Sequence, residues 1–446
     1  MNTPICDFVR DFAQKNSARL HMPGHKGVNL LGCENLDITE IQGADSLYEA
    51  QGIIRESEQN ASTLFGCDTF YSTEGSSQCI RAMLYLVTLY AKEKGIKPLI
   101  YAGRNAHKTF ISSCALIDFQ IQWLYPQKGE SYLSCTIDAE ALDAMLSSAQ
   151  EKPAALYLTS PDYLGNVADI SGISQVCRKH GVLLAVDNAH GAYLRFLEKS
   201  QHPIDLGADI CCDSAHKTLP VLTGGAYLHI SPSSPAVFTQ RAKDALCLFG
   251  STSPSYLILQ SLDRANRYIA EGYTEKLSGF TALTSKVKET LSQKGYFLAG
   301  NEELKITISA KPYGYKGTDL ADILLRENIV CEFADPDFLV LMLTPENTEA
   351  ELQKLCDVLC SIPALSPLCE APPEFHKPEK AMSVREAVFS QSEVVNVRDS
   401  TGRIISAASV GCPPAVPIAV CGEIIDETTA EIFSYYGIDT CTVIKE

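Results

Sequence analysis

The chain has 446 residues, of which 46% are apolar and 20% charged, and its 37 Lys+Arg against 54 Asp+Glu give a formal net charge of -17. This composition is too apolar for a disordered chain, and its acidity argues against binding to nucleic acid, which requires clustered Lys and Arg. We find no basic leader before an apolar run and no apolar stretch near the roughly 18 residues of a membrane span. We therefore expect a cytoplasmic protein without membrane contact.

The 17 cysteines are odd in number and form no C-x-x-C pair. A disulfide framework would be short and evenly paired, and a zinc site would show closer ligand spacing. We therefore expect mostly buried thiols in a reducing compartment and no metal.

From about residue 60 to 230, the sequence alternates between helical and strand patterns. An amphipathic helix is predicted from Gln78 to Gly95, and a second one from Ser171 to His180. Short, continuous apolar runs predict strands at 99–102, 155–159, 182–186, 209–212 and 225–230. This pattern predicts an α/β fold with a mostly parallel sheet covered by helices on both faces. Ligands of such sheets bind beyond the carboxyl ends of the strands.

The remainder of the chain predicts smaller α+β parts. Residues 254–294 are mainly helical in pattern, and the segment 302–362 predicts helices at 318–328 and 347–361, with Asn347 and Thr348 as capping residues of the second helix. Five prolines make 361–380 a linker or extended crossing, and Gly411–Glu423 indicates a compact terminal module.

Lys217 is the most informative candidate for chemistry. It lies in Asp213-Ser-Ala-His-Lys-Thr218, directly after the run 209–212. Burial at a strand end lowers the pKa of a lysine and makes its amine nucleophilic. A solvated surface lysine would explain the residue alone equally well.

Two further features accompany this lysine. Asp187 ends the run 182–186, and a buried carboxylate there requires a cation, such as the protonated ring nitrogen of pyridoxal phosphate. The small residues of Ser72–Ser77 precede the first helix and could bind a phosphate at its N-terminus. Ordinary capping explains either feature by itself.

The order of these three features is that of the aspartate aminotransferase-like (fold type I) pyridoxal-phosphate enzymes. More specifically, the chain resembles the short form of the Orn/Lys/Arg decarboxylase family, which lacks the N-terminal wing domain. The resemblance rests on motifs in the family's order, namely His21–Gly27, Gly103–Lys108, Asp187–Gly191, Ser214–Pro220, Ser251–Tyr256 and the segment CPPAVPIAVCGE. It implies a pyridoxal 5'-phosphate cofactor.

The resemblance also implies the roles of individual residues around the cofactor ring. Lys217 matches the lysine that binds the cofactor as a Schiff base, and His216 matches the adjacent histidine that assists decarboxylation. Asp187 matches the partner of the ring nitrogen, Ala189 the small residue against the ring, and His107 the histidine stacked on the ring's other face. Either histidine could instead be purely structural.

Other matched residues bind the phosphate or lie at an interface. Gly75, Ser76 and Ser214 match the phosphate ligands. Thr252 and Ser253 resemble residues that reach a neighbouring active site, which implies a homodimer or an assembly of dimers.

Several residues depart from the family pattern or have an open role. Asn188 stands where the family often has Glu, Tyr193 where it often has His, and Gly224 where it often has Gln, so the substrate is less certain than the cofactor chemistry. His21 and His25 do not form a helical metal pair, because Pro23-Gly24 lies between them. The segment could contact substrate or form a tight turn.

The sequence thus predicts α-decarboxylation of a basic amino acid, with arginine favoured over lysine and ornithine, in polyamine-related metabolism. The alternatives are another pyridoxal-phosphate reaction, such as that of an aminotransferase or lyase, and a non-catalytic paralogue. We predict four parts: an N-terminal arm (1–30), a cofactor-binding domain (31–260), a small α+β domain (261–362) and a C-terminal decarboxylase-type module (363–446).

Overall fold

The computed structural model describes residues 1–15, 17–375, 377–407 and 415–445. The chain forms two compact units. The first unit comprises Met1–Pro98, Leu146–Tyr157 and Ile170–Leu277, and the second comprises Leu99–Met145, Leu158–Asp169 and Ser278–Glu446. Gly411–Pro414 of the predicted terminal module lie outside the described residues.

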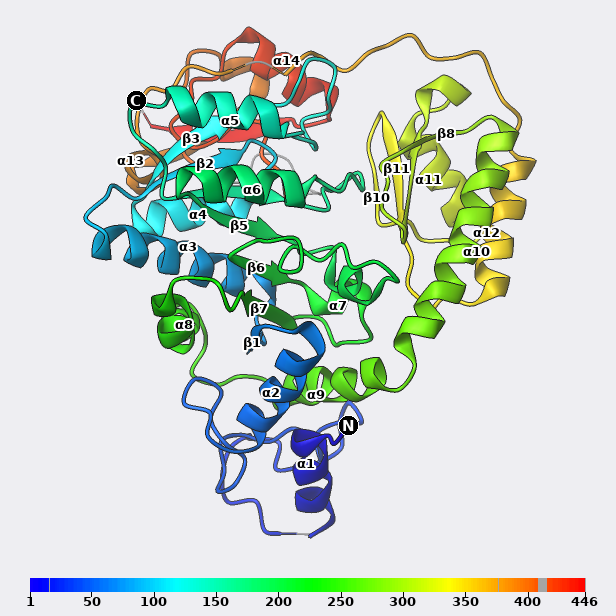
Figure 1. The fold of residues 1–446 in the computed structure, drawn as a ribbon. Coiled ribbons are helices and arrows are strands. Elements are labelled where there is room, and N and C mark those ends of the chain that lie inside the picture. Colours follow the sequence, from blue (N-terminus) through cyan, green and yellow to red (C-terminus); the bar gives the residue numbers. More distant parts are fainter. Residues whose placement is uncertain (16, 376, 408–414, 446) are drawn as a thin grey trace. The chain divides into compact units, whose positions relative to one another are not determined.

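A seven-stranded sheet with the order β1-β7-β6-β5-β4-β2-β3 is the main feature of the fold (Figure 1). Its strands are β1 (Asp68–Ser72), β2 (Leu99–Gly103), β3 (Gln120–Leu124), β4 (Ala155–Thr159), β5 (Leu183–Asp187), β6 (Ile210–Asp213) and β7 (Ala226–Ile230). The pairs β5·β6 and β2·β3 are parallel, whereas β7 runs antiparallel to β1 and β6. Residues 183–187 are all buried, as expected of a strand between helical layers. The predicted mostly parallel α/β sheet is confirmed.

Helices pack against this sheet in the first unit. The helices there are α1 (Pro4–Gln14), α2 (Ile53–Phe65), α3 (Gly75–Glu93), α6 (Ile170–His180), the 3-10 helix η1 (Ala192–Phe196), α7 (Ala215–Thr218), α8 (Ala236–Leu248) and α9 (Tyr256–Ala270). The helix α3 packs against α8 and against the buried strands β6 and β7. Two helices, α5 (Ala139–Ser148) and α10 (Tyr273–Lys294), run across the boundaries between the units.

The second unit contains two smaller antiparallel sheets. Its further elements are α4 (Lys108–Ile117), β8 (Phe297–Ala299), β9 (Lys305–Ser309), η2 (Lys311–Tyr313), α11 (Gly317–Arg326), β10 (Phe333–Ala334), β11 (Phe338–Met342), α12 (Glu349–Ser361), α13 (Val384–Phe389), β12 (Ser392–Asn396), η3 (Val397–Asp399), α14 (Glu427–Tyr435) and β13 (Thr440–Ile444). One small sheet has the order β10-β11-β9-β8, and the other consists of β12 and β13. The second of these covers a core that includes Ile405, Ile425 and Phe433.

Most predicted boundaries hold to within a few residues. The helix α12 begins after Thr348, whose hydroxyl accepts a hydrogen bond from Glu351 N, as its predicted capping role requires. The predicted helix from Gln78 was wrong at its start, because α3 already begins at Gly75. Gly75 has φ +72°, a conformation that favours glycine, so the chain enters the helix three residues earlier than its apolar pattern suggests.

In the described part of the chain, no helix combines the length and apolarity needed to cross a bilayer.

Candidate active site

Two neighbouring parallel strands deliver the main predicted residues to one edge of the sheet. Asp187, the last residue of β5, lies opposite Cys212 of β6, so the segment that carries Lys217 begins beside it. Asn188 N donates to Cys212 O at 3.0 Å, and Ser214 N donates to Ala189 O at 3.3 Å. The two strand ends are therefore joined beyond the ladder itself.

Asp187 is a buried carboxylate with neutral hydrogen-bond donors. Its side chain accepts hydrogen bonds from Tyr157 Oη at 3.1 Å, Ala189 N at 3.3 Å and, more weakly, Cys212 Sγ at 3.7 Å. Burial raises the pKa of Asp187 above its ordinary value, while the charge of Lys217 and the Tyr157 hydroxyl act in the opposite direction. Among the described residues, it forms no ion pair, so it is suited to a cationic N–H donor from a ligand.

Lys217 lies in the short helix α7, and its amine contacts a histidine. Lys217 Nζ is 2.9 Å from His190 Nε2, and the His190 residue is only 6% exposed. His190 follows Asp187 by three residues, so the end of β5 and the loop after it supply the two groups. The structure thereby brings together a carboxylate, an amine and an imidazole from two strand ends.

His216, the histidine directly before Lys217, is held differently. Its Nδ1 lies 3.0 Å from Gly225 O, and since a carbonyl only accepts, Nδ1 is the donor. Burial lowers the pKa of His216, which favours the neutral ring. The neutral ring keeps Nε2 as an acceptor.

The predicted phosphate ligands meet at the start of α3. Ser214 Oγ donates to Ser76 Oγ at 2.8 Å, and a Cβ added to Gly75 would meet no atom within 4 Å. Gly75 N donates to Gly224 O at 2.7 Å, which attaches this turn to the loop before β7. Hydroxyl groups and a helix N-terminus beside open space form a suitable anion site.

The remaining predicted residues are His107, Thr252 and Ser253. His107 belongs to the second unit, where its Nδ1 accepts a hydrogen bond from Thr109 N at 3.1 Å and caps α4. Thr252 and Ser253 are exposed in the first unit. Their predicted roles remain predictions.

Three residues of the site were missed by sequence reasoning. His190 and Asn188 lie within the segment Asp187–Gly191, but nothing in one sequence says which of its side chains contacts Lys217. Tyr157 lies in a predicted strand as an apolar residue, and only the adjacency of β4 and β5 assigns its hydroxyl to Asp187.

Comparison with known proteins agrees with this geometry. Residues 3–310 match the major domain of the Orn/Lys/Arg decarboxylase family, and residues 368–440 match its C-terminal domain. The chain belongs to the Orn/Lys/Arg decarboxylase family. The arginine decarboxylase of Halalkalibacterium halodurans is 30% identical over 96% of this chain and 91% of its own length, and that of Bacillus subtilis is 28% identical over 95% and 91%.

A solved structure confirms the fold of this Orn/Lys/Arg decarboxylase family member. The lysine decarboxylase of Francisella novicida superposes with a TM-score of 0.77 at 17% identity, covering 99% of this chain and 79% of that protein. At this identity, the likeness concerns the fold alone.

The residues at the two strand ends fit the predicted cofactor. Pyridoxal phosphate has a ring nitrogen that would donate to the buried Asp187, an aldehyde suited to the Lys217 amine, and a phosphate suited to the start of α3. The open space beside Gly75 leaves room for that phosphate.

Two departures from the family pattern have structural explanations. Gly224 has φ +101°, and a Cβ there would lie 2.9 Å from Thr73 O, so this chain requires glycine where its loop meets the phosphate turn. Asn188 donates from Nδ2 to Asp213 Oδ1 at 2.7 Å. Tyr193 is buried in η1, and nothing described explains why it replaces a histidine.

One buried group in this decarboxylase has the composition of a metal site. His202, Cys211 and Asp213 have potential ligand atoms within 4.8 Å of one another. Asp213 Oδ2, however, accepts hydrogen bonds from His202 Nε2 at 3.2 Å and His229 Nε2 at 3.1 Å, so the group is hydrogen-bonded without a metal.

The N-terminal family segment contains a hydrogen-bonded histidine, His25. His25 Nε2 lies 3.1 Å from Asp37 Oδ2, and Gly27 N donates to His25 Nδ1 at 3.0 Å. Both ring nitrogens of His25 are therefore occupied, which favours the structural interpretation for this residue.

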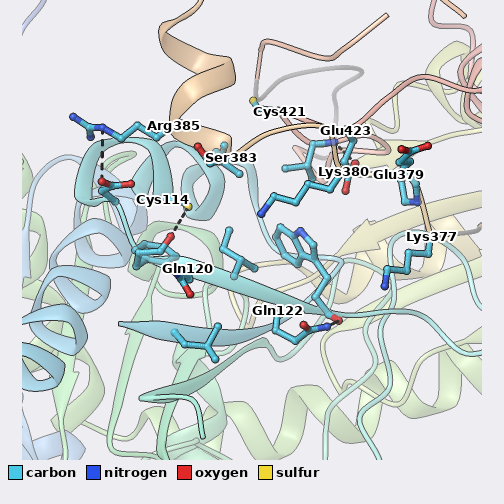
Figure 2. A pocket seen from close by; sticks show the side chains of 18 of the residues that line it. Cys114, Gln120, Gln122, Lys377, Glu379, Lys380, Ser383, Arg385, Cys421 and Glu423 are labelled. Atoms are coloured by element: carbon cyan, nitrogen blue, oxygen red, sulfur yellow. Dashed lines mark hydrogen bonds and ion pairs between the residues drawn. The ribbon is translucent and has the colours of Figure 1, made fainter. Parts of the chain in front are cut away.

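The second unit contains a cavity of about 870 Å³ whose lining residues differ from those of the predicted site (Figure 2). Its walls include β3, the segment Lys377–Arg385 and Glu423, and the side chain of Lys380 points into it. None of the predicted site residues lines it.

Proposed function

We propose that this chain is a pyridoxal-phosphate-dependent α-decarboxylase of a basic amino acid, with arginine as its preferred substrate. The observation that carries the proposal is the juxtaposition of a buried carboxylate, Asp187, and a strand-end amine, Lys217, on the paired strands β5 and β6. In support of arginine, four curated relatives with 26% to 30% identity are named arginine decarboxylase.

When bound, pyridoxal phosphate supplies the electron sink for the electron pair that the departing carboxyl group leaves on the α-carbon. Asp187 keeps the ring nitrogen protonated, because a carboxylate in a buried site strongly favours a cationic partner. Lys217 would hold the cofactor through its amine and would supply the proton that the α-carbon takes up. His216, with a neutral ring, assists the loss of the carboxyl group or the protonation that follows.

The other side chains position the cofactor. Gly75, Ser76 and Ser214 bind its phosphate through the start of α3 and two hydroxyl groups. Further placements follow the family resemblance: Ala189 packs against the ring, His107 stacks on the opposite face, and Thr252 and Ser253 serve a neighbouring site in a homodimer.

The test is carbon dioxide release from arginine, lysine and ornithine by purified protein with added pyridoxal phosphate. We expect the highest kcat/KM with arginine and the corresponding amine as product, in a cytoplasmic, polyamine-related reaction. Accumulation of pyridoxamine phosphate without carbon dioxide would indicate an aminotransferase instead. Failure to bind the cofactor at all would indicate a non-catalytic paralogue.

A further inference from the structure

The contact between Lys217 and His190 has no counterpart in the roles assigned above. Lys217 Nζ and His190 Nε2 lie 2.9 Å apart, at hydrogen-bond distance. His190 comes from the loop after β5, and Lys217 comes from α7 after β6. His190 is buried, whereas Lys217 is half-buried.

The chemistry of the two groups restricts where their protons lie. An ammonium group only donates hydrogen bonds, and a protonated imidazole donates from both nitrogens. Two donors cannot share one hydrogen bond, so at least one of Nζ and Nε2 lacks a proton at this contact. A single proton therefore lies between Nζ and Nε2, with one nitrogen as its donor and the other as its acceptor.

We infer that His190 is a catalytic base that takes the proton of Lys217 and so frees the amine to bond to the cofactor, an inference that rests on the proposed cofactor. The proton moves from Nζ to Nε2, which leaves a neutral amine and an imidazolium ion. The Nζ lone pair then forms the bond to the cofactor's aldehyde carbon, and the condensation releases one water molecule. Only a neutral amine is nucleophilic.

The surrounding groups favour His190 over His216 for this step. His216 Nδ1 is committed to Gly225 O, and the contact with Nζ is made by His190. The titratable groups that interact with Lys217 by charge include Asp187 at the end of β5 and His216 in α7. Asp187 acts on Lys217 by charge, but its own hydrogen bonds come from Tyr157, Ala189 and Cys212.

The first test measures Lys217 in apoprotein, independently of turnover. The rate at which an amine-acylating reagent labels Lys217 is followed by peptide mass spectrometry across neutral and alkaline pH. In His190→Gln, labelling near neutral pH should be about 10-fold slower than in wild type, because no imidazole accepts the proton of Nζ as the amine reacts.

The second test follows the binding of pyridoxal phosphate to apoprotein by visible absorbance. His190→Gln should slow this binding near neutral pH by a similar factor, and added imidazole should restore the rate in His190→Ala. His216→Gln provides the matched comparison, because it removes the other nearby histidine, and it should leave the rate of labelling unchanged.

Unchanged labelling in both His190 variants, with circular dichroism like that of wild type, would overturn the inference. An equal slowing of labelling in His216→Gln would also overturn it, because loss of either histidine would then have the same effect. If His190→Gln does not fold, the imidazole rescue of His190→Ala decides the question. Loss of carbon dioxide release with normal labelling behaviour would count against the proposed function alone.

Discussion

Asn188 Nδ2 donates a hydrogen bond of 2.7 Å to Asp213 Oδ1, and this bond links the residue after Asp187 to the segment that carries Lys217. The other oxygen of Asp213 accepts from His202 and His229. Burial alone would raise the pKa of Asp213, but the two histidines overcome it and hold the pKa well below its usual range. Asp213 is therefore an ionised anchor between the strand ends.

Replacing this anchor should destabilise the fold. Asp213→Asn should lower the free energy of unfolding by about 3 kcal/mol, because the buried donors lose their carboxylate. Because the native pKa is depressed, the contribution of Asp213 is present above the unfolded pKa of about 3.9 and is lost only in stronger acid. Urea unfolding near neutral pH gives the measurement.

Asn188→Asp provides the matched partner variant. In the double variant Asn188→Asp, Asp213→Asn, the amide and carboxylate change places, so the loss should be smaller than the sum of the two single losses. Strict additivity would show that the Asn188–Asp213 bond contributes nothing.

Asp187→Asn should impair chemistry more than stability. Loss of the buried negative charge should reduce kcat by about 100-fold and weaken cofactor retention, because the ring nitrogen loses its ionic partner. Asp209→Asn is a suitable control, since Asp209 accepts a hydrogen bond from Leu184 N at 2.7 Å near the opposite end of β5. Near-normal turnover of Asp187→Asn would refute the assigned role.

Lys217→Ala should abolish both the covalently bound cofactor and turnover while the fold remains. Intact-mass analysis after borohydride reduction detects the cofactor, and circular dichroism monitors the fold. Covalent cofactor retained in this variant would assign the attachment to another lysine.

The site could be predicted from the sequence where its residues follow strand ends. Asp187 comes directly after one apolar run and Lys217 lies in the segment that follows another, and parallel pairing of β5 and β6 brings such residues together. His190 could not be assigned in this way, because its contact with Lys217 depends on the path of the loop after β5. The hydrogen bond from Tyr157 to Asp187 likewise depends on which strands are neighbours.

The fold was predictable where the local signals agree, as at Thr348 and α12. The start of α3 at Gly75 was harder to predict. Gly75 has a positive φ, and no apolar residue at this position indicates that the helix begins there. The four parts expected from the sequence remain a prediction, and each of the two compact units collects segments that are distant in the chain. Local sequence patterns do not indicate which distant segments belong to the same unit.

Gly224→Ala should disturb the phosphate turn. A methyl group there would lie 2.9 Å from Thr73 O at φ +101°, so we expect a loss of about 2 kcal/mol in stability and weaker cofactor retention. Gly95→Ala is the matched control, because Gly95 has φ +66° but no atom within 4 Å of the added Cβ. Equal stability losses in urea unfolding would exclude a steric contribution from Thr73.

Asp335 should make the stability of the fold depend on pH. Burial raises its pKa to about 7, although the amides of Phe338 and Asp337 bond its Oδ1. Because the native pKa is raised, this group's contribution is full below the unfolded pKa of about 3.9 and is lost as pH rises through about 7. The exposed Asp322 on α11 provides a control position.

Urea unfolding at about pH 5 and about pH 8 checks this dependence. Wild type and Asp322→Asn should both lose stability between these values, and Asp335→Asn should lose less. An equal loss in all three proteins would exclude Asp335 as the source.

The guanidinium of Arg104, the residue after β2, is buried, and its hydrogen-bond acceptors lie in the C-terminal module. It donates to Pro417 O at 2.8 Å, to Ile418 O at 3.0 Å and to Glu423 Oε2 at 3.0 Å, and its side chain is 1% exposed. A fragment that ends before this module would retain the cation and lose all three acceptors. The C-terminal segment thus supplies the hydrogen-bond acceptors of a buried cation in the second unit. In a truncated decarboxylase without this segment, burial of the Arg104 guanidinium would be unfavourable.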